Sequence, residues 1–207
     1  MNQLEFNQQF AIYDNCEERR NRAFALYLNS RANRNNFCLL GRNDAIETII
    51  GHIIGELAPE QILLVTDGNA ANFYTTNDIQ NGNVLRANFW SLAVNDAWVI
   101  GGINGGSTFN FVGTAALSLL DFNEIYLRGS AQYPITVTAR EILGLMGAGY
   151  TPNVLNGALV FTPSAGRDLT TFDFVEYDEV INRYANADER LSAIFAYLEP
   201  AFQQLGG

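Results

Sequence analysis

Lysine is absent from this chain of 207 residues, because all twelve of its basic residues are arginines. A GC-rich genome replaces lysine by arginine but also depletes asparagine, which is abundant here, and halophilic adaptation usually brings far more than the 22 acids present. A third explanation is selection against the amine to which ubiquitin is attached. That explanation predicts delivery of the protein into a foreign cytosol. Compositional accident or engineering stays open beside it.

Cysteine and histidine are almost as scarce. Cys16 and Cys38 fit neither a CxxC motif nor a metal-ligand spacing, and His52 is the single histidine. The two thiols are either free or joined in one disulfide, and a Cys-His hydrolase has little support. We therefore expect neither a metal nor a cofactor.

Long hydrophobic runs are also missing. No apolar stretch approaches the roughly 18 residues of a membrane-spanning helix. The first ten residues have neither the basic start nor the apolar core of a secretory signal. We expect no membrane span and no signal peptide, and the sequence leaves the location of the protein open.

The composition is that of a globular protein, with 48% hydrophobic and 16% charged residues. A chain of this length buries roughly three quarters of its unfolded surface, so it needs no metal or disulfide for stability. We expect residues 1–207 to form a single domain.

The net charge of −10 is unevenly distributed. Residues 19–42 contain six arginines and no acid, whereas residues 168–199 contain eight acids against Arg183 and Arg190. The overall sign argues against broad nucleic-acid affinity, which needs a positive face. The arginine-rich segment either supplies such a face locally or is a solvated helix face.

The hydrophobic pattern predicts an α+β fold with N-terminal helices, an antiparallel or mixed sheet and C-terminal helices. The predicted N-terminal helices cover residues 17–32 and 44–57. Predicted strands cover residues 61–66, 88–94, 97–103 and 107–113, with Asn-Asp and Gly-Gly punctuation that indicates antiparallel hairpins. The C-terminal half is predicted as a helix at 114–121, a strand at 124–129, a helix at 138–146, a strand at 158–163 and one long helix from about 177 to 205.

The start of the predicted helix at 138–146 carries a capping pattern. Thr136 or Thr138 is expected to cap it, because Glu141 follows Thr138 by three residues, as in a capping box.

Two segments resemble a known family. LAVNDAWVIGGINGGSTFNF at 92–111 and EIYLRGSAQYPIT at 124–136 resemble the strand pair and the later tyrosine-containing signature of the ribosome-inactivating rRNA N-glycosidases. The resemblance covers roughly residues 61–140. It implies a toxin-like hydrolase that releases adenine from ribosomal RNA, with the ribosome or its RNA as partner.

The resemblance also implies a substrate site. An enzyme that acts on a nucleobase holds the flipped base between aromatic faces, and each stacked ring contributes about 1–3 kcal/mol. By resemblance, Trp98 and Tyr133 would stack on the base and the backbone of Val99 would bind it. The ordinary alternatives are a core tryptophan and a tyrosine that packs in a turn.

Cleavage of the N-glycosidic bond further requires a carboxylate that stabilises the oxocarbenium-like sugar and a guanidinium that assists the departing purine. The family places Glu and Arg three residues apart on a helix, whereas YDEVINRY here places Glu179 and Arg183 four apart. Both spacings put the pair on one helical face. Glu176 is the alternative acid. The ordinary alternative is a surface ion pair.

Two other functions stay open. The acidic C-terminal helix is typical of a non-enzymatic binding protein, such as an immunity protein or an assembly subunit, that contacts a basic partner. An ADP-ribosyltransferase toxin would instead use Arg128 on a strand, with Glu176 or Glu179 as its acid.

Overall fold

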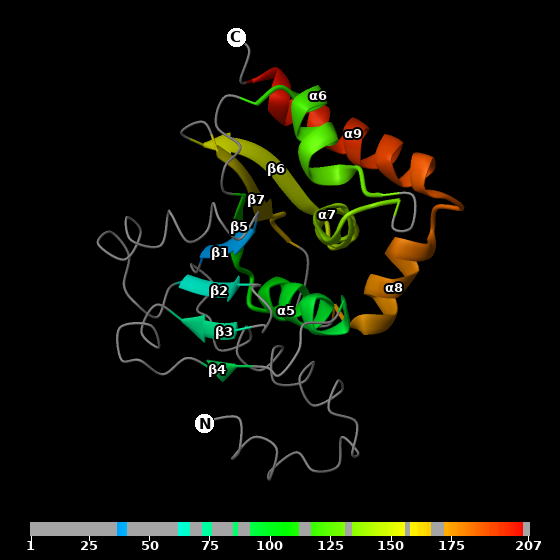
Figure 1. The fold of residues 1–207 in the computed structure, drawn as a ribbon. Helices are drawn as coiled ribbons and strands as arrows, with labels where there is room; N and C mark the ends of the chain where they lie inside the picture. The colour runs from blue at the N-terminus through cyan, green and yellow to red at the C-terminus, as the bar shows by residue number, and fades with distance from the viewer. Residues whose placement is uncertain are drawn as a thin grey trace.

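The structure is a computed structural model. It describes residues 37–40, 62–66, 72–75, 85–86, 92–111, 117–130, 134–155, 158–166 and 172–204. The fold within these residues is α+β, as predicted, with helices packed beside one mixed sheet (Figure 1). The helices predicted at 17–32 and 44–57 lie outside the described residues, as do Cys16 and His52.

The sheet has seven strands in the order β4-β3-β2-β1-β5-β7-β6. Their bounds are β1 Phe37–Leu40, β2 Ile62–Thr66, β3 Asn72–Thr75, β4 Leu85–Arg86, β5 Thr108–Phe111, β6 Tyr150–Leu155 and β7 Ala158–Pro163. Strand β1 runs parallel to β2 and to β5, and every other pair is antiparallel. The strands predicted at 61–66, 107–113 and 158–163 are confirmed by β2, β5 and β7, whereas β1, β3, β4 and β6 were not predicted.

Helix α5, Leu92–Asn104, covers the strand predicted at 97–103 and the last three residues of the strand predicted at 88–94, of which residues 88–91 lie outside the described part of the chain. That prediction is wrong because the segment is apolar on nearly every side, which hides the helical period and makes short apolar runs look like buried strands. The fully buried Val99, Ile100 and Ile103 follow helical spacing. The helix ends where Gly106 adopts a φ of 65°, a conformation that glycine reaches without strain.

A second predicted strand, at 124–129, is also helical. Ser118 caps α6, Leu119–Phe122, in a capping box with Asp121, and the chain continues as a π-helix, η3, Asn123–Leu127. Within the predicted strand, only Arg128 is paired as in a sheet, through an isolated β-bridge to Ile135. The extended conformation is therefore confined to the end of that segment.

Helix α7, Val137–Gly147, confirms the helix predicted at 138–146. Thr136 is the cap, since its side chain accepts a hydrogen bond from the amide of Ala139. Thr138 lies inside α7 and is therefore not its cap, and Glu141 is buried.

The long helix predicted from 177 to 205 is two helices, α8 Phe174–Asn182 and α9 Ala187–Gln203. Asn186 caps α9 by accepting from the amide of Glu189, and the Glu189 carboxylate accepts from the amide of Ala185. This reciprocal cap starts a new helix.

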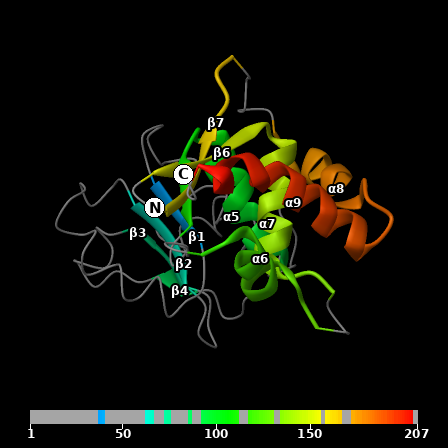
Figure 2. The same ribbon diagram turned by 90° about the horizontal axis from the view of Figure 1, so that it is seen from above.

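A hydrophobic core lies between the antiparallel strands β5, β7 and β6 and the helices α6, α7 and α9. Its buried rings include Phe111, Phe122 and Tyr126, whose centroids lie 5.1–5.3 Å apart. Figures 1 and 2 show α8 and α9 on the side of the molecule away from β2, β3 and β4. Among the described residues, no helix is long and apolar enough to cross a membrane.

Candidate functional site

The residues predicted to bind the base are Trp98, Tyr133 and Val99. Trp98 belongs to α5 and not to a strand, and Tyr133 lies outside the described residues. Val99 is completely buried in the middle of α5. The hydrogen bonds of the helix engage its backbone there, so that backbone is not offered to a base in this arrangement.

Glu179 and Arg183 are both exposed on α8, one turn apart, with Arg183 at the C-cap. No ion pair joins these two described residues, so the predicted surface pair is not formed here. Glu176, the alternative acid, is half-buried in the first turn of α8. The acid and the arginine therefore share a helix, while their approach to Trp98 and Tyr133 stays a prediction.

Arg128, proposed for a transferase strand, ends the π-helix instead. Its Nε lies 3.1 Å from Oε1 of Glu124 in an exposed ion pair. Arg128 is thus paired with a residue one helical turn before it. The strand that the ADP-ribosyltransferase hypothesis required at this position is not formed.

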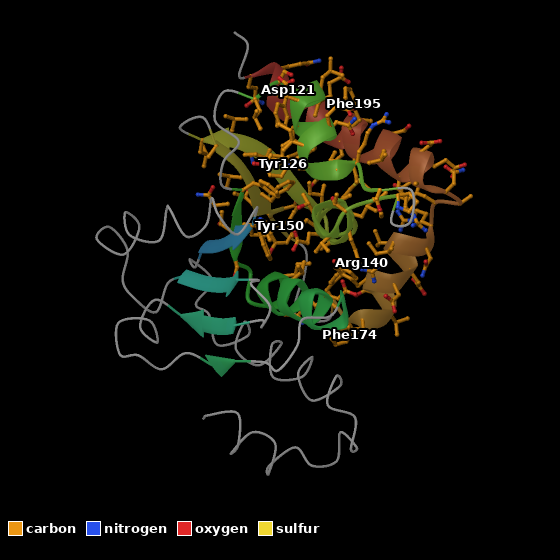
Figure 3. All side chains as sticks on the ribbon, in the orientation of Figure 1. Asp121, Tyr126, Arg140, Tyr150, Phe174 and Phe195 are labelled. Atoms are coloured by element: carbon orange, nitrogen blue, oxygen red, sulfur yellow. The ribbon has the colours of Figure 1, made fainter. Side chains whose placement is uncertain are left out.

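The structure brings together a different set of charged groups, where α5, α7 and α8 meet. Arg140 of α7 binds Asp96 of α5 through both carboxylate oxygens, with Nε–Oδ1 and Nη2–Oδ2 distances of 2.9 and 2.8 Å. Asp96 is only 3% exposed. The same guanidinium also reaches Asp178 of α8, with 3.4 Å between Nη2 and Oδ1. Figure 3 shows Arg140 near α8, at the edge of the helical layer.

Tyr177 of α8 completes this network. The Arg140 guanidinium lies 5.6 Å from the centre of its ring, and the Tyr177 hydroxyl donates to the carbonyl of Arg140 at 3.3 Å. Complete burial raises the pKa of the Tyr177 hydroxyl well above its ordinary value of 10, chiefly by desolvation. The hydrogen bonds to Asp96 raise the pKa of Arg140. The tyrosine is therefore neutral and the arginine charged at neutral pH, and the network fastens three helices together.

The sequence offered little warning of this network. Asp96 and Arg140 are 44 residues apart, and Arg140 and Tyr177 are 37 apart. The one local signal is that Asp96 stands inside an apolar stretch, where a buried acid needs a charged partner. Periodicity does not say which arginine supplies it.

The acids of α8 and α9 other than the half-buried Glu176 fall into two classes. Asp173 caps α8, Asp178 binds Arg140, and Glu189 caps α9, so the charges of these acids are used within the fold. The other class consists of exposed acids that form no hydrogen bond or ion pair with any described residue, and we call them the outer acids: Glu179, Asp188 and Glu199.

Two arginines lie on the same helices as the outer acids. Arg183 is exposed, whereas Arg190 is half-buried and donates to the carbonyl of Tyr184 at 3.5 Å. Within the described part of the chain, no group of three or more His, Cys, Asp or Glu side chains is placed to hold a metal ion. The geometry therefore offers an acidic surface.

Comparison with known proteins adds no family to this description. No family model matches the chain, and neither a curated protein nor a solved structure is significantly similar to it.

Proposed function

We propose that this protein is an acidic binding domain that takes a basic protein partner on the exposed surface of α8 and α9. One observation carries the proposal: Glu179, Asp188 and Glu199 present their charges to solvent without a partner among the described residues. The apolar sides of the same helices are already buried in the core. The charges that these helices present to solvent are mostly negative, with Arg183 as an exposed arginine among them.

Such a surface acts mainly on the rate of encounter. Complementary charges steer a partner toward the correct face and raise the association rate at low salt. Salt screens this attraction, with a Debye length of about 8 Å at physiological ionic strength. The proposal therefore fits an immunity-type or assembly-type protein whose partner carries a basic patch.

The test measures association rates with a fluorescent oligo-arginine peptide as the basic probe. Glu179→Gln combined with Glu199→Gln neutralises two outer acids and raises the net charge from −10 to −8. We expect this variant to associate several-fold more slowly at low salt, with the difference shrinking as salt is added.

Glu124→Arg is the matched control, because it gives the same net charge of −8 by a change on η3. Its association rate should stay near that of the wild type. If the two variants slow association equally, binding follows net charge alone and the proposal is wrong.

A second candidate function rests on a separate observation. Glu179 and Arg183 are both exposed and lie one turn apart on α8, which leaves an acid and a guanidinium open to a substrate. This exposed pair supports an rRNA N-glycosidase in which Trp98 and Tyr133 hold the base. The resemblance of residues 92–111 to the family's strand pair adds no support, because residues 92–104 form helix α5.

Incubation with ribosomes followed by aniline treatment tests that candidate. An N-glycosidase yields a new rRNA fragment that Glu179→Ala and Arg183→Ala each reduce by about a hundredfold or more. Asp178→Asn, on the same helix, serves as the control and should cleave normally. Absence of the fragment with the wild-type protein excludes the activity.

A further inference from the structure

We propose that Pro152 and Tyr197 close the outer edge of the sheet, so that a second copy of this chain cannot add a strand to β6. Among the described strands, β6 is the last in the sheet order and pairs with β7 alone. A free edge strand presents N–H and C=O groups that can pair with another chain and so lead to self-association. This inference concerns the sheet and does not depend on the proposed function of α8 and α9.

The pairing with β7 determines which residues of β6 face the open edge. In an antiparallel pair, residues that exchange hydrogen bonds with the neighbouring strand alternate with residues whose N–H and C=O point away from it. Leu155 pairs with Ala158 across a connection of two residues, and the ends of such a turn are hydrogen bonded to each other. Counting back in steps of two, the odd-numbered residues of β6 bond to β7. The even-numbered residues, Tyr150, Pro152 and Val154, face the open edge.

The two prolines of this hairpin agree with that assignment. Proline has no N–H, so a sheet accepts it where that group would not bond to the neighbouring strand. Pro152 lies at an edge-facing position, opposite Phe161, and Pro163 lies opposite the edge-facing Tyr150. Both prolines therefore stand in pairs that exchange no hydrogen bond, and Pro152 removes a donor from the middle of the open edge.

Tyr197 of α9 occupies a second group of this edge. Helix α9 packs against β6 (Figure 2). The Tyr197 hydroxyl donates to the carbonyl of Tyr150 at 2.6 Å, and its ring is stacked with Phe161, with 6.2 Å between the ring centres. The acceptor at Tyr150 is thus already bonded and the donor at Pro152 is missing. An incoming strand would find both a donor and an acceptor at Val154 alone.

The composition of β6 explains why the edge needs this protection. Edge strands are commonly kept apart by charged side chains, lysine above all. This chain has no lysine, and the β6 sequence YTPNVL contains no charged residue. Leu155, at the end of the strand, is 55% exposed. The proline and the tyrosine hydroxyl therefore do for β6 what charge does for other edge strands.

The test restores both groups to the edge. Pro152→Thr supplies the missing N–H and favours a strand, and Tyr197→Phe frees the Tyr150 carbonyl while keeping the aromatic ring. We expect Pro152→Thr to dimerise about tenfold more tightly than the wild type, because each copy gains a backbone donor. The double variant should dimerise about two- to tenfold more tightly still, since each copy also gains an acceptor. Analytical ultracentrifugation over a range of concentrations measures these dimerisation constants.

Thr151→Val is the matched control, because it keeps a β-branched side chain on the same strand while its backbone groups face β7. It should associate as the wild type does. Hydrogen exchange locates the contact, and the amides at 152 and 154 of the double variant should exchange more slowly as its concentration rises.

The inference is overturned if the double variant associates no more than Thr151→Val does, or if its association leaves those two amides unprotected. The thermal midpoint shows whether Tyr197→Phe has weakened the fold. If it has, Pro152→Thr alone, which keeps the Tyr197 contact, is compared with Thr151→Val, and equal association of these two variants also overturns the inference.

Discussion

At the scale of single residues, the position of an acid says less about its role than its partners do. Asp178 and Glu179 are neighbours on α8, and both are exposed. Asp178 lies 3.4 Å from the Arg140 guanidinium, whereas Glu179 has no partner among the described residues. Glu179 should therefore contribute more than Asp178 to the electrostatic attraction of a basic partner.

This difference predicts unequal effects of two equal charge changes. Asp178→Asn should slow the association with oligo-arginine less than Glu179→Gln does, because the Arg140 guanidinium, which also binds Asp96, offsets part of the Asp178 charge. Glu179→Gln should slow association at low salt. Stopped-flow fluorescence measures both rates, and a larger effect at Asp178 contradicts this division of the acids.

Asp96 predicts an effect on stability. Asp96→Ala leaves the Arg140 guanidinium without its buried carboxylate, and breaking a buried pair from one side costs about 3–5 kcal/mol. Urea unfolding measures the loss. Glu124→Ala, which breaks the exposed ion pair with Arg128, should lower the free energy of unfolding by less than about 1 kcal/mol. If the two variants lose the same free energy of unfolding, burial does not determine the strength of these ion pairs.

Tyr177 predicts sensitivity to alkaline pH. Its pKa is raised in the folded protein above the ordinary value of 10, chiefly by burial. The stability it contributes is complete below pH 10 and falls as the pH rises above that value, because the unfolded tyrosine ionises first. Tyr177→Phe should flatten the loss of stability measured by urea unfolding between pH 9 and pH 11, and an unaltered slope would contradict the role of this residue.

At the scale of elements, α7 and α8 approach closely only because α7 carries two glycines on the contacting side. A Cβ at Gly144 would lie 2.2 Å from the ring of Tyr177, and one at Gly147 would lie 2.2 Å from Val180. These are interior contacts between rigid helices, so neither neighbour has room to withdraw.

Gly144→Ala should therefore destabilise the protein by about 1–3 kcal/mol or more, although alanine favours helix more than glycine does. Thr138→Ala, at a half-buried position of the same helix, is the control and should be close to neutral. Chemical denaturation compares them, and a stabilised Gly144→Ala protein would show that α8 does not pack as described.

Sequence patterns predicted the elements whose signals are local. Helix α7 and strands β2, β5 and β7 were found from periodicity, because each has one clear apolar side or a short apolar run between turns. Helix α5 was predicted as strands because its apolar residues surround it, and the break before α9 was missed because the apolar stripe continues across Asn186. The deciding contacts are tertiary for α5, whereas the break before α9 is set by the local cap formed by Asn186 and Glu189.

The candidate site shows the same limit more strongly. Glu179 and Arg183 were predicted from spacing along one helix, and they do share α8. Asp96, Arg140 and Tyr177 come from three helices that are distant in sequence, and no short-range pattern joins them. Spacing therefore identified the exposed pair, whereas the buried network appears only once the helices are packed.

At the scale of the whole molecule, charge is divided between the inside and the outside of the helical layer. Asp96, Arg140 and Tyr177 hold α5, α7 and α8 together, and the acids that are not needed for this purpose face solvent on α8 and α9. The scaffold thus keeps a negative surface in a fixed position beside a rigid core. An acidic binding domain requires this combination of a fixed frame and unpaired outward charge.

The most direct measurement of this claim is a titration of the ¹⁵N-labelled protein with the oligo-arginine peptide, followed by the shifts of backbone amide resonances. We expect the largest shifts on α8 and α9, near Glu179, Asp188 and Glu199, and the shifts should fade as salt is added. Shifts that are spread evenly over the protein, or that centre on α6 and η3, would contradict the account.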